Sequence, residues 1–99
     1  MFTNKKWTFN QTNIEHAPDN PGVFLLWEGD EVIYVGHARD TIKAMLIRHL
    51  EGAFGGCTKS STHYSWEITL WPAARETQLL AEFAKQYQRD PRCQQKKVA

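Results

Sequence analysis

Glu76 is the strongest candidate for a catalytic or metal-binding residue, because it is a carboxylate at the start of an apolar helical stripe. Leu80 and Phe83 follow it at helical spacing, and side chains three or four residues apart share one helix face. Glu76 is therefore expected to point toward the rest of the fold. It is either a metal ligand or acid/base group, or a helix-dipole or capping residue, which is the usual role of a first-turn glutamate.

Tyr34 is a second candidate, because it lies near the end of an apolar segment, two residues before Gly36. Its side chain either packs in the core or holds its hydroxyl in a cleft. The imidazole and guanidinium groups that follow along the chain belong to His37, Arg39, Arg48, His49 and His63. Each histidine is either a functional group or only a solvated or hydrogen-bonded one. The absence of His-Glu-x-x-His and Cys-x-x-Cys spacings argues against a structural zinc site.

Length and charge limit the classes of protein to consider. The chain has 99 residues, with 12 Lys and Arg against 11 Asp and Glu, which fits one domain and not a polycation held to nucleic acid by bulk charge. No apolar run approaches the roughly 18 residues of a membrane span, so no membrane partner is expected. Residues 1–6 lack the apolar core of a signal peptide, and a cytoplasmic protein is expected. Cys57 and Cys93 are expected to be free thiols.

The apolar pattern predicts the order of the structural elements. The runs 22–27 and 32–36 flank a polar turn, and their β-branched and aromatic residues predict a β-hairpin. Both runs are almost continuously apolar, which predicts that both faces of the hairpin are covered. Periodicity then predicts, in chain order, a helix between Asp40 as N-cap and Gly52, a loop over 53–62, a strand over 64–70 and a helix over 73–87.

This order of elements predicts an α+β fold, or α/β sandwich, in which one hairpin strand pairs with a third strand and helices pack over the sheet. Residues 1–20 are expected to form an N-terminal arm or edge strand. Residues 21–94 are the expected domain, and residues 95–99 a basic tail.

Residues 22–36 resemble the paired signature of the GIY-YIG endonuclease domain family. The two signature triplets are occupied here by Gly22, Val23 and Phe24, and by Tyr34, Val35 and Gly36. Three later segments match further family motifs in order: MLIRH at 45–49, ETQLL at 76–80 and PRCQ at 91–94. The resemblance covers residues 21–94, and the order and spacing of the motifs are more specific than any one of them.

The resemblance implies a three-stranded antiparallel sheet flanked by helices, and divalent-metal-dependent hydrolysis of a phosphodiester, usually in DNA. Under that scheme Glu76 binds a single Mg²⁺ or Mn²⁺ ion, a signature tyrosine such as Tyr34 activates water, and a helix arginine holds the phosphate. His49 retains the histidine of the helix motif. The candidate contacts to nucleic acid are His37, Arg39, Arg48 and Lys85.

The departures from the family pattern bear directly on catalysis. Phe24 lacks the hydroxyl of the first signature tyrosine, Met45 stands where the catalytic arginine is expected, and Gln94 replaces the terminal asparagine. Losing a positioned phosphate-binding cation costs about 10² to 10³ in rate, by analogy with removal of one oxyanion donor. Arg48 lies three residues after Met45 on nearly the same helix face, so it either replaces the missing cation or is a solvated helix-end charge.

Two hypotheses follow from the sequence. In the first, the chain is a GIY-YIG-type nuclease with weakened or lost activity, and Tyr34, His49 and Glu76 converge on a cleft that Arg48 or Arg39 enters. In the second, the chain is a non-catalytic module for nucleic acid or protein, in which Phe24 and Met45 pack in the core and the cleft is closed or apolar. Residues 75–99 hold six basic and three acidic residues, which predicts weak binding of DNA. Because the chain is short, a protein partner is expected to supply specificity.

Overall fold

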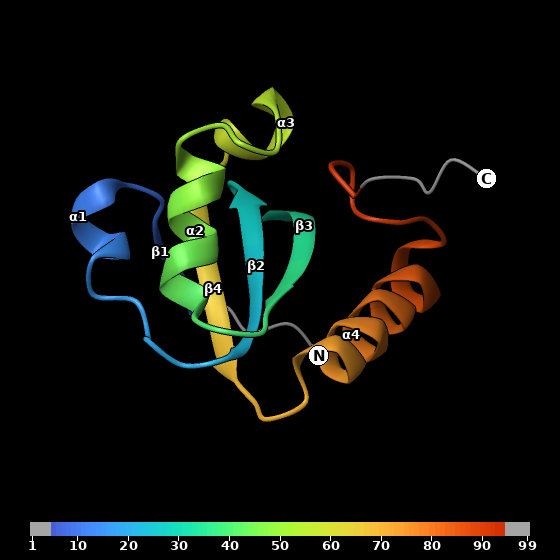
Figure 1. Cartoon of the computed structure of the whole chain (residues 1–99). Helices are drawn as coiled ribbons and strands as arrows, with labels where there is room; N and C mark the ends of the chain where they lie inside the picture. Colours follow the sequence, from blue (N-terminus) through green and yellow to red (C-terminus); the bar gives the residue numbers. More distant parts are fainter. Residues whose placement is uncertain (1–4, 95–99) are drawn as a thin grey trace.

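An antiparallel sheet of four strands lies at the centre of the computed structural model, which describes residues 5–94 (Figure 1). The strands are β1 (Trp7–Thr8), β2 (Gly22–Glu28), β3 (Glu31–Ala38) and β4 (His63–Ile68), in the spatial order β1-β4-β2-β3. The predicted α+β class and the predicted hairpin are confirmed. The sheet has four strands and not three, because the short β1 pairs with the outer side of β4.

Four helices flank the sheet: α1 (Gln11–Ile14), α2 (Ile42–Leu50), α3 (Gly56–Lys59) and α4 (Pro72–Tyr87). Helix α2 begins one residue later than predicted, because Thr41 and not Asp40 is the N-cap. The Thr41 hydroxyl accepts a hydrogen bond of 3.1 Å from the backbone N–H of Ala44. Pro72 opens α4, where its missing N–H costs nothing. Helices α1 and α3 were not predicted, because four residues are too few to show a periodicity.

The hairpin is covered on both faces, as its continuous apolar runs predicted. Alternate residues of β2 point to opposite sides, so Phe24 packs toward α1 and α2 while Val23 packs toward α4. Figure 1 shows α2 and α4 on opposite sides of the hairpin. The core on the α4 side includes Leu79 and Phe83. Because both helices rest on buried strands, the ends of β3 and the facing ends of α2 and α4 are held in fixed positions.

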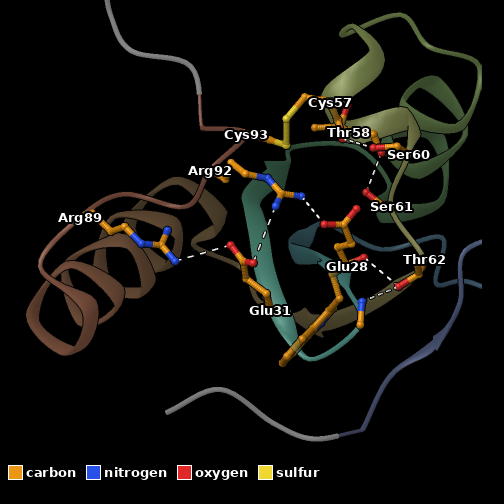
Figure 2. Close-up of polar contacts among 12 residues, drawn as sticks. Glu28, Glu31, Cys57, Thr58, Ser60, Ser61, Thr62, Arg89, Arg92 and Cys93 are labelled. Carbon is orange, nitrogen blue, oxygen red and sulfur yellow. Dashed lines mark hydrogen bonds and ion pairs between the residues drawn. A yellow bond between two sulfur atoms is a disulfide. The ribbon is translucent and has the colours of Figure 1, made fainter.

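The expectation of free thiols is wrong, because Cys57 and Cys93 form a disulfide with a Cα–Cα distance of 5.7 Å (Figure 2). The bond joins α3 to the segment after α4, two parts of the chain that no local pattern places together. The Cys93 N–H also donates a 2.7 Å hydrogen bond to the Ile33 carbonyl on β3. Disulfides persist in oxidising compartments, so this bond gives no support to the cytoplasmic expectation. Within residues 5–94, none of the helices is both long and apolar enough to cross a membrane.

The arginines of the C-terminal third are engaged in ion pairs and do not form a free basic face. Arg92 lies 2.6 Å from Glu28 and Arg89 lies 3.5 Å from Glu31, so both tie the C-terminal segment to the hairpin (Figure 2). Arg75 pairs in the same way with a glutamate of β4. The predicted basic footprint is therefore largely neutralised in the described chain, and the predicted basic tail, 95–99, lies outside the described residues.

Candidate active site

A cleft of about 630 Å³ opens where the end of β3 meets α2, α4 and the C-terminal segment. The side chains that line it include Tyr34, His37, Arg39, Asp40, Thr41, Met45, Arg48, Glu76 and Gln94. The structure therefore brings together most of the residues predicted for the site, from elements up to 60 positions apart in the sequence. Lys85 is exposed on α4 and does not line this cleft.

Glu76 faces the sheet, as the helical stripe predicted, and contacts His37 of β3. The distance between His37 Nδ1 and Glu76 Oε1 is 2.8 Å, and the Glu76 side chain is 23% exposed. With Nδ1 protonated, the imidazole donates to the carboxylate and fixes its orientation, while Glu76 Oε2 has no hydrogen-bond partner within residues 5–94. His37 was predicted only as a contact to nucleic acid, and its pairing with Glu76 depends on a strand–helix contact that no local pattern reveals.

Tyr34 is half-buried, and its side chain lines the same cleft. Burial raises the pKa of the Tyr34 phenol, and the negative charge of Glu76 raises the pKa further. The phenol therefore keeps its proton at neutral pH. No residue among 5–94 accepts a hydrogen bond from its hydroxyl, so that group is available to a molecule in the cleft.

His49 does not reach the cleft, contrary to the predicted convergence. Its side chain is fully buried, and its ring lies 5.0 Å from that of Tyr34 and 4.3 Å from that of Phe54. Nδ1 lies 2.9 Å from the Thr58 hydroxyl, whereas Nε2 is buried without a partner among the described residues. Burial, together with the charge of Arg48, lowers the pKa of His49 to about 4. His49 is therefore a neutral side chain that supports the Tyr34 ring from behind.

Two arginines supply positive charge at the cleft in place of the arginine that Met45 replaces. Arg39 is exposed in the loop after β3, and Arg48 is exposed on α2 with its guanidinium 4.7 Å from the Phe54 ring. Neither forms an ion pair with another described residue. Met45 lines the same cleft and is partly buried against the core. The cleft thus keeps two cations near the position where the sequence lacks one.

Gln94 closes the cleft from the C-terminal side. Its Oε1 accepts a 3.0 Å hydrogen bond from the Val35 N–H, and its Nε2 donates a 2.9 Å hydrogen bond to the Val35 carbonyl. The side chain thereby pairs with β3 as a neighbouring strand would. The preceding residue, Cys93, is held beside the hairpin by the disulfide and by its hydrogen bond to the Ile33 carbonyl.

Comparison with known proteins identifies the fold. No protein-family model and no curated protein matches this chain. Among solved structures, the GIY-YIG N-terminal endonuclease domain of UvrC from Thermotoga maritima, in a tyrosine-to-phenylalanine form, matches with a TM-score of 0.60 and 22% identity, covering 86% of this chain and 93% of that one. The chain has the GIY-YIG endonuclease fold. The magnesium-bound form of the same domain matches with a TM-score of 0.59 and 20% identity, covering 87% of this chain and 100% of that one.

The glycines of the GIY-YIG signature are explained by close packing. A Cβ on Gly36 would lie 2.5 Å from the Phe24 ring and 2.7 Å from the Tyr34 ring, so only glycine lets both rings close over β3. A Cβ on Gly22 would clash with the Glu67 carbonyl of β4 and lie 2.7 Å from Ile42 of α2. The signature thus fixes the packing that presents Tyr34 to the cleft.

The donor set of this GIY-YIG cleft fits a hard divalent cation. Both matched forms of the UvrC domain hold a catalytic divalent cation. No group of three His, Cys, Asp or Glu side chains within residues 5–94 could enclose a metal ion. Mg²⁺, however, keeps several waters and needs only one or two carboxylates plus substrate phosphates. Glu76 offers such a carboxylate, with one oxygen free and the other held by His37, which is how outer-shell partners orient metal ligands.

Proposed function

We propose that this chain hydrolyses phosphodiester bonds in DNA in a divalent-metal-dependent reaction of the GIY-YIG type, with weakened turnover. One observation supports this most strongly: Glu76 shares an open cleft with the Tyr34 hydroxyl and two arginines. Within residues 5–94, one Glu76 carboxylate oxygen and both guanidinium groups have no polar partner. A closed or apolar cleft, expected of a non-catalytic module, is not what these side chains form.

Each group in the cleft has a distinct role in this proposal. Glu76 would hold Mg²⁺ or Mn²⁺, an ion that polarises the phosphate and stabilises the leaving oxygen when bound. Arg39 and Arg48 would donate charge-assisted hydrogen bonds to the non-bridging phosphate oxygens. Tyr34 is protonated at neutral pH, so its oxygen would accept a hydrogen bond from the attacking water and orient it. Positive charge near Glu76 would offset the electrostatic part of the raised pKa of Tyr34, so that a larger fraction of Tyr34 would be phenolate and could accept the proton of the attacking water.

Two departures from the family pattern, one in the core and one in the cleft, are the reason for the expected weakness. Phe24 is fully buried and brings no hydroxyl to the reaction. Met45 brings no charge, and the loss of one positioned donor costs about 10² to 10³ in rate. Arg48 lies one helical turn away and would recover part of that loss.

A second candidate function is a binding module for nucleic acid or protein on the same scaffold. The packing of Phe24 in the core and of Met45 against it favours this alternative, which also leaves the charged cleft to bind a phosphate without cleaving it. Separation of the two functions therefore needs a cleavage assay and not only a binding assay.

The test is a cleavage panel with purified protein on single-stranded, duplex and branched DNA, with Mg²⁺, Mn²⁺ or EDTA. We expect slow nicking with either metal and none in EDTA. Binding without cleavage of any substrate would support the module and overturn the nuclease. Cleavage that persists in EDTA would also contradict the proposal.

A further inference from the structure

A second hollow adjoins the active-site cleft at Arg39. It has a volume of about 380 Å³, within the range of about 300 to 1,000 Å³ typical of small-molecule sites. Its lining comes from Pro21, just before β2, and from the segment that joins β4 to α4, with Leu70, Trp71 and Pro72. Arg39 lines both the active-site cleft and this second hollow, which we call the groove. A polymeric ligand that extends from the cleft past Arg39 therefore enters the groove.

Trp71 is the most conspicuous side chain in the groove. It is 73% exposed and its neighbour Leu70 is 79% exposed. Exposed apolar surface that is contiguous can mark an interaction site. The backbone beneath it is held firmly. The Trp71 N–H donates to the Thr69 hydroxyl at 3.1 Å, and its carbonyl accepts a 2.9 Å hydrogen bond from the Arg75 N–H in the first turn of α4. These hydrogen bonds fix the backbone that carries the indole.

The combination of an unpaired arginine and an exposed indole matches the chemistry of a nucleotide. The guanidinium of Arg39 has no ion-pair partner among the described residues, and it complements a phosphate. The face of an indole complements the face of a base, and such stacking contributes about 1–3 kcal/mol per base. A polypeptide partner would use the apolar surface of Leu70 and Trp71, but it would have no need of the free cation that joins this groove to the cleft.

We propose that Trp71 stacks on an unpaired base next to the scissile phosphate, so that the substrate is DNA with single-stranded character at the cleavage position. This inference rests on the proposed nuclease function and extends it to the class of substrate. Bases within a duplex are paired and already stacked on their neighbours, so only a single strand, a bubble, a flap or an extruded nucleotide can offer a free face.

The test measures binding in EDTA, where cleavage cannot interfere. Fluorescence anisotropy would compare a labelled single strand of about 12 nucleotides, within the site sizes of single-strand-binding proteins, with a blunt hairpin duplex. The proteins are the wild type, Trp71→Ala, Trp71→Phe and, as a control, Tyr87→Ala, which removes a 49%-exposed aromatic ring at the other end of α4. Circular dichroism and light scattering would show whether each variant keeps the wild-type fold and oligomeric state.

We expect Trp71→Ala to weaken single-strand binding by about 5- to 150-fold, the range that corresponds to loss of one stacked base. Trp71→Phe should retain most of the affinity, and duplex binding and the Tyr87 control should be unchanged. Equal effects on single strand and duplex, or no effect on either, would overturn the proposal. Conversion of a wild-type dimer to a monomer by Trp71→Ala would also overturn it, because the groove would then hold a second copy.

The outcomes separate this inference from the proposed function. Cleavage that depends on Glu76 but not on Trp71, and that does not prefer unpaired DNA, would defeat the stacking site alone. Trp71-dependent binding of single strands by a protein that cleaves nothing would support the stacking site and defeat the nuclease alone.

Discussion

Acid titration of His49 is expected to weaken the fold within a defined pH window. Burial lowers the pKa of His49 from its ordinary 6.5 to about 4 in the folded chain. Between these two values, the unfolded chain binds a proton that the folded chain does not bind. The free energy of unfolding therefore falls as the pH is lowered through this window, and His49 imposes no such penalty above it.

The size of the effect follows from the difference between the folded and unfolded pKa of His49. A tenfold difference in proton affinity corresponds to about 1.4 kcal/mol, so full titration of His49 would lower the free energy of unfolding by about 3 kcal/mol. Such a loss is a large part of the about 5–15 kcal/mol by which a domain is usually stable. Carboxylates also titrate near pH 4, so the contribution of His49 has to be isolated by comparison with a variant.

His49→Phe is the matched variant for this measurement. Phenylalanine keeps an aromatic ring against Phe24, Tyr34 and Phe54, and it removes only the titrating group and the hydrogen bond to Thr58. The lost hydrogen bond costs about 1 kcal/mol at every pH above the window. Urea unfolding of both proteins, in steps from pH 7.5 to pH 4, gives the difference in free energy of unfolding at each pH.

We expect the wild type to lose about 3 kcal/mol more than His49→Phe between pH 6.5 and pH 4. Parallel pH profiles would contradict a buried, neutral His49, because they would mean that its side chain is charged or solvated in the folded chain. In that case His49 would be available to the cleft after all, and the catalytic role implied by the sequence would have to be restored.

Three further predictions concern the disulfide and the cleft. The Cys57–Cys93 disulfide closes a loop of 36 residues, so its reduction should lower the free energy of unfolding by up to about 4 kcal/mol. Urea unfolding curves that coincide with and without dithiothreitol would contradict the presence of this disulfide. Met45→Arg should raise the single-turnover cleavage rate by up to about 10²-fold, and an unchanged rate would show that the position is not next to the phosphate. His37→Ala should weaken the apparent Mn²⁺ affinity in cleavage by about 10-fold or more, because an oriented carboxylate binds better, while thermal melting stays close to wild type; an unchanged metal titration would remove the positioning role.

The parts of the fold predicted from the sequence are those with a local physical signature. Continuous apolar runs placed the hairpin and its burial on both faces, and helical periodicity placed α2, α4 and the inward orientation of Glu76. The short helices α1 and α3 leave no such signature, and β1 lies in the segment 1–20 that was expected to be either an arm or an edge strand. Their positions depend on pairing and packing with distant residues.

The sequence predicted which side chains reach the cleft, but not the contacts between side chains of distant segments. The residues that reach the cleft as predicted are Tyr34, Arg39, Arg48 and Glu76. Their placement follows from the strand, loop or helix that carries each of them. The pairing of His37 with Glu76 depends on how closely α4 approaches β3, which no segment determines by itself.

Two other features depend on the closure of distant loops. The ring contacts that bury His49 form only when the segment with Phe54 and Thr58 folds back over α2. The bond between Cys57 and Cys93 likewise requires α3 and the C-terminal segment to meet.

The metal-dependent cleavage rate of Glu76→Gln, compared with that of the wild type, decides whether Glu76 is the metal ligand of a nuclease site. The substitution keeps the size of the side chain and removes the anionic ligand. Glu15→Gln removes a carboxylate that is exposed next to α1, outside the residues that line the cleft, and serves as the control. We predict Mn²⁺-dependent cleavage of single-stranded DNA by the wild type and by Glu15→Gln, and none by Glu76→Gln. Equal cleavage by all three proteins would show that the activity does not come from this cleft and would contradict the account.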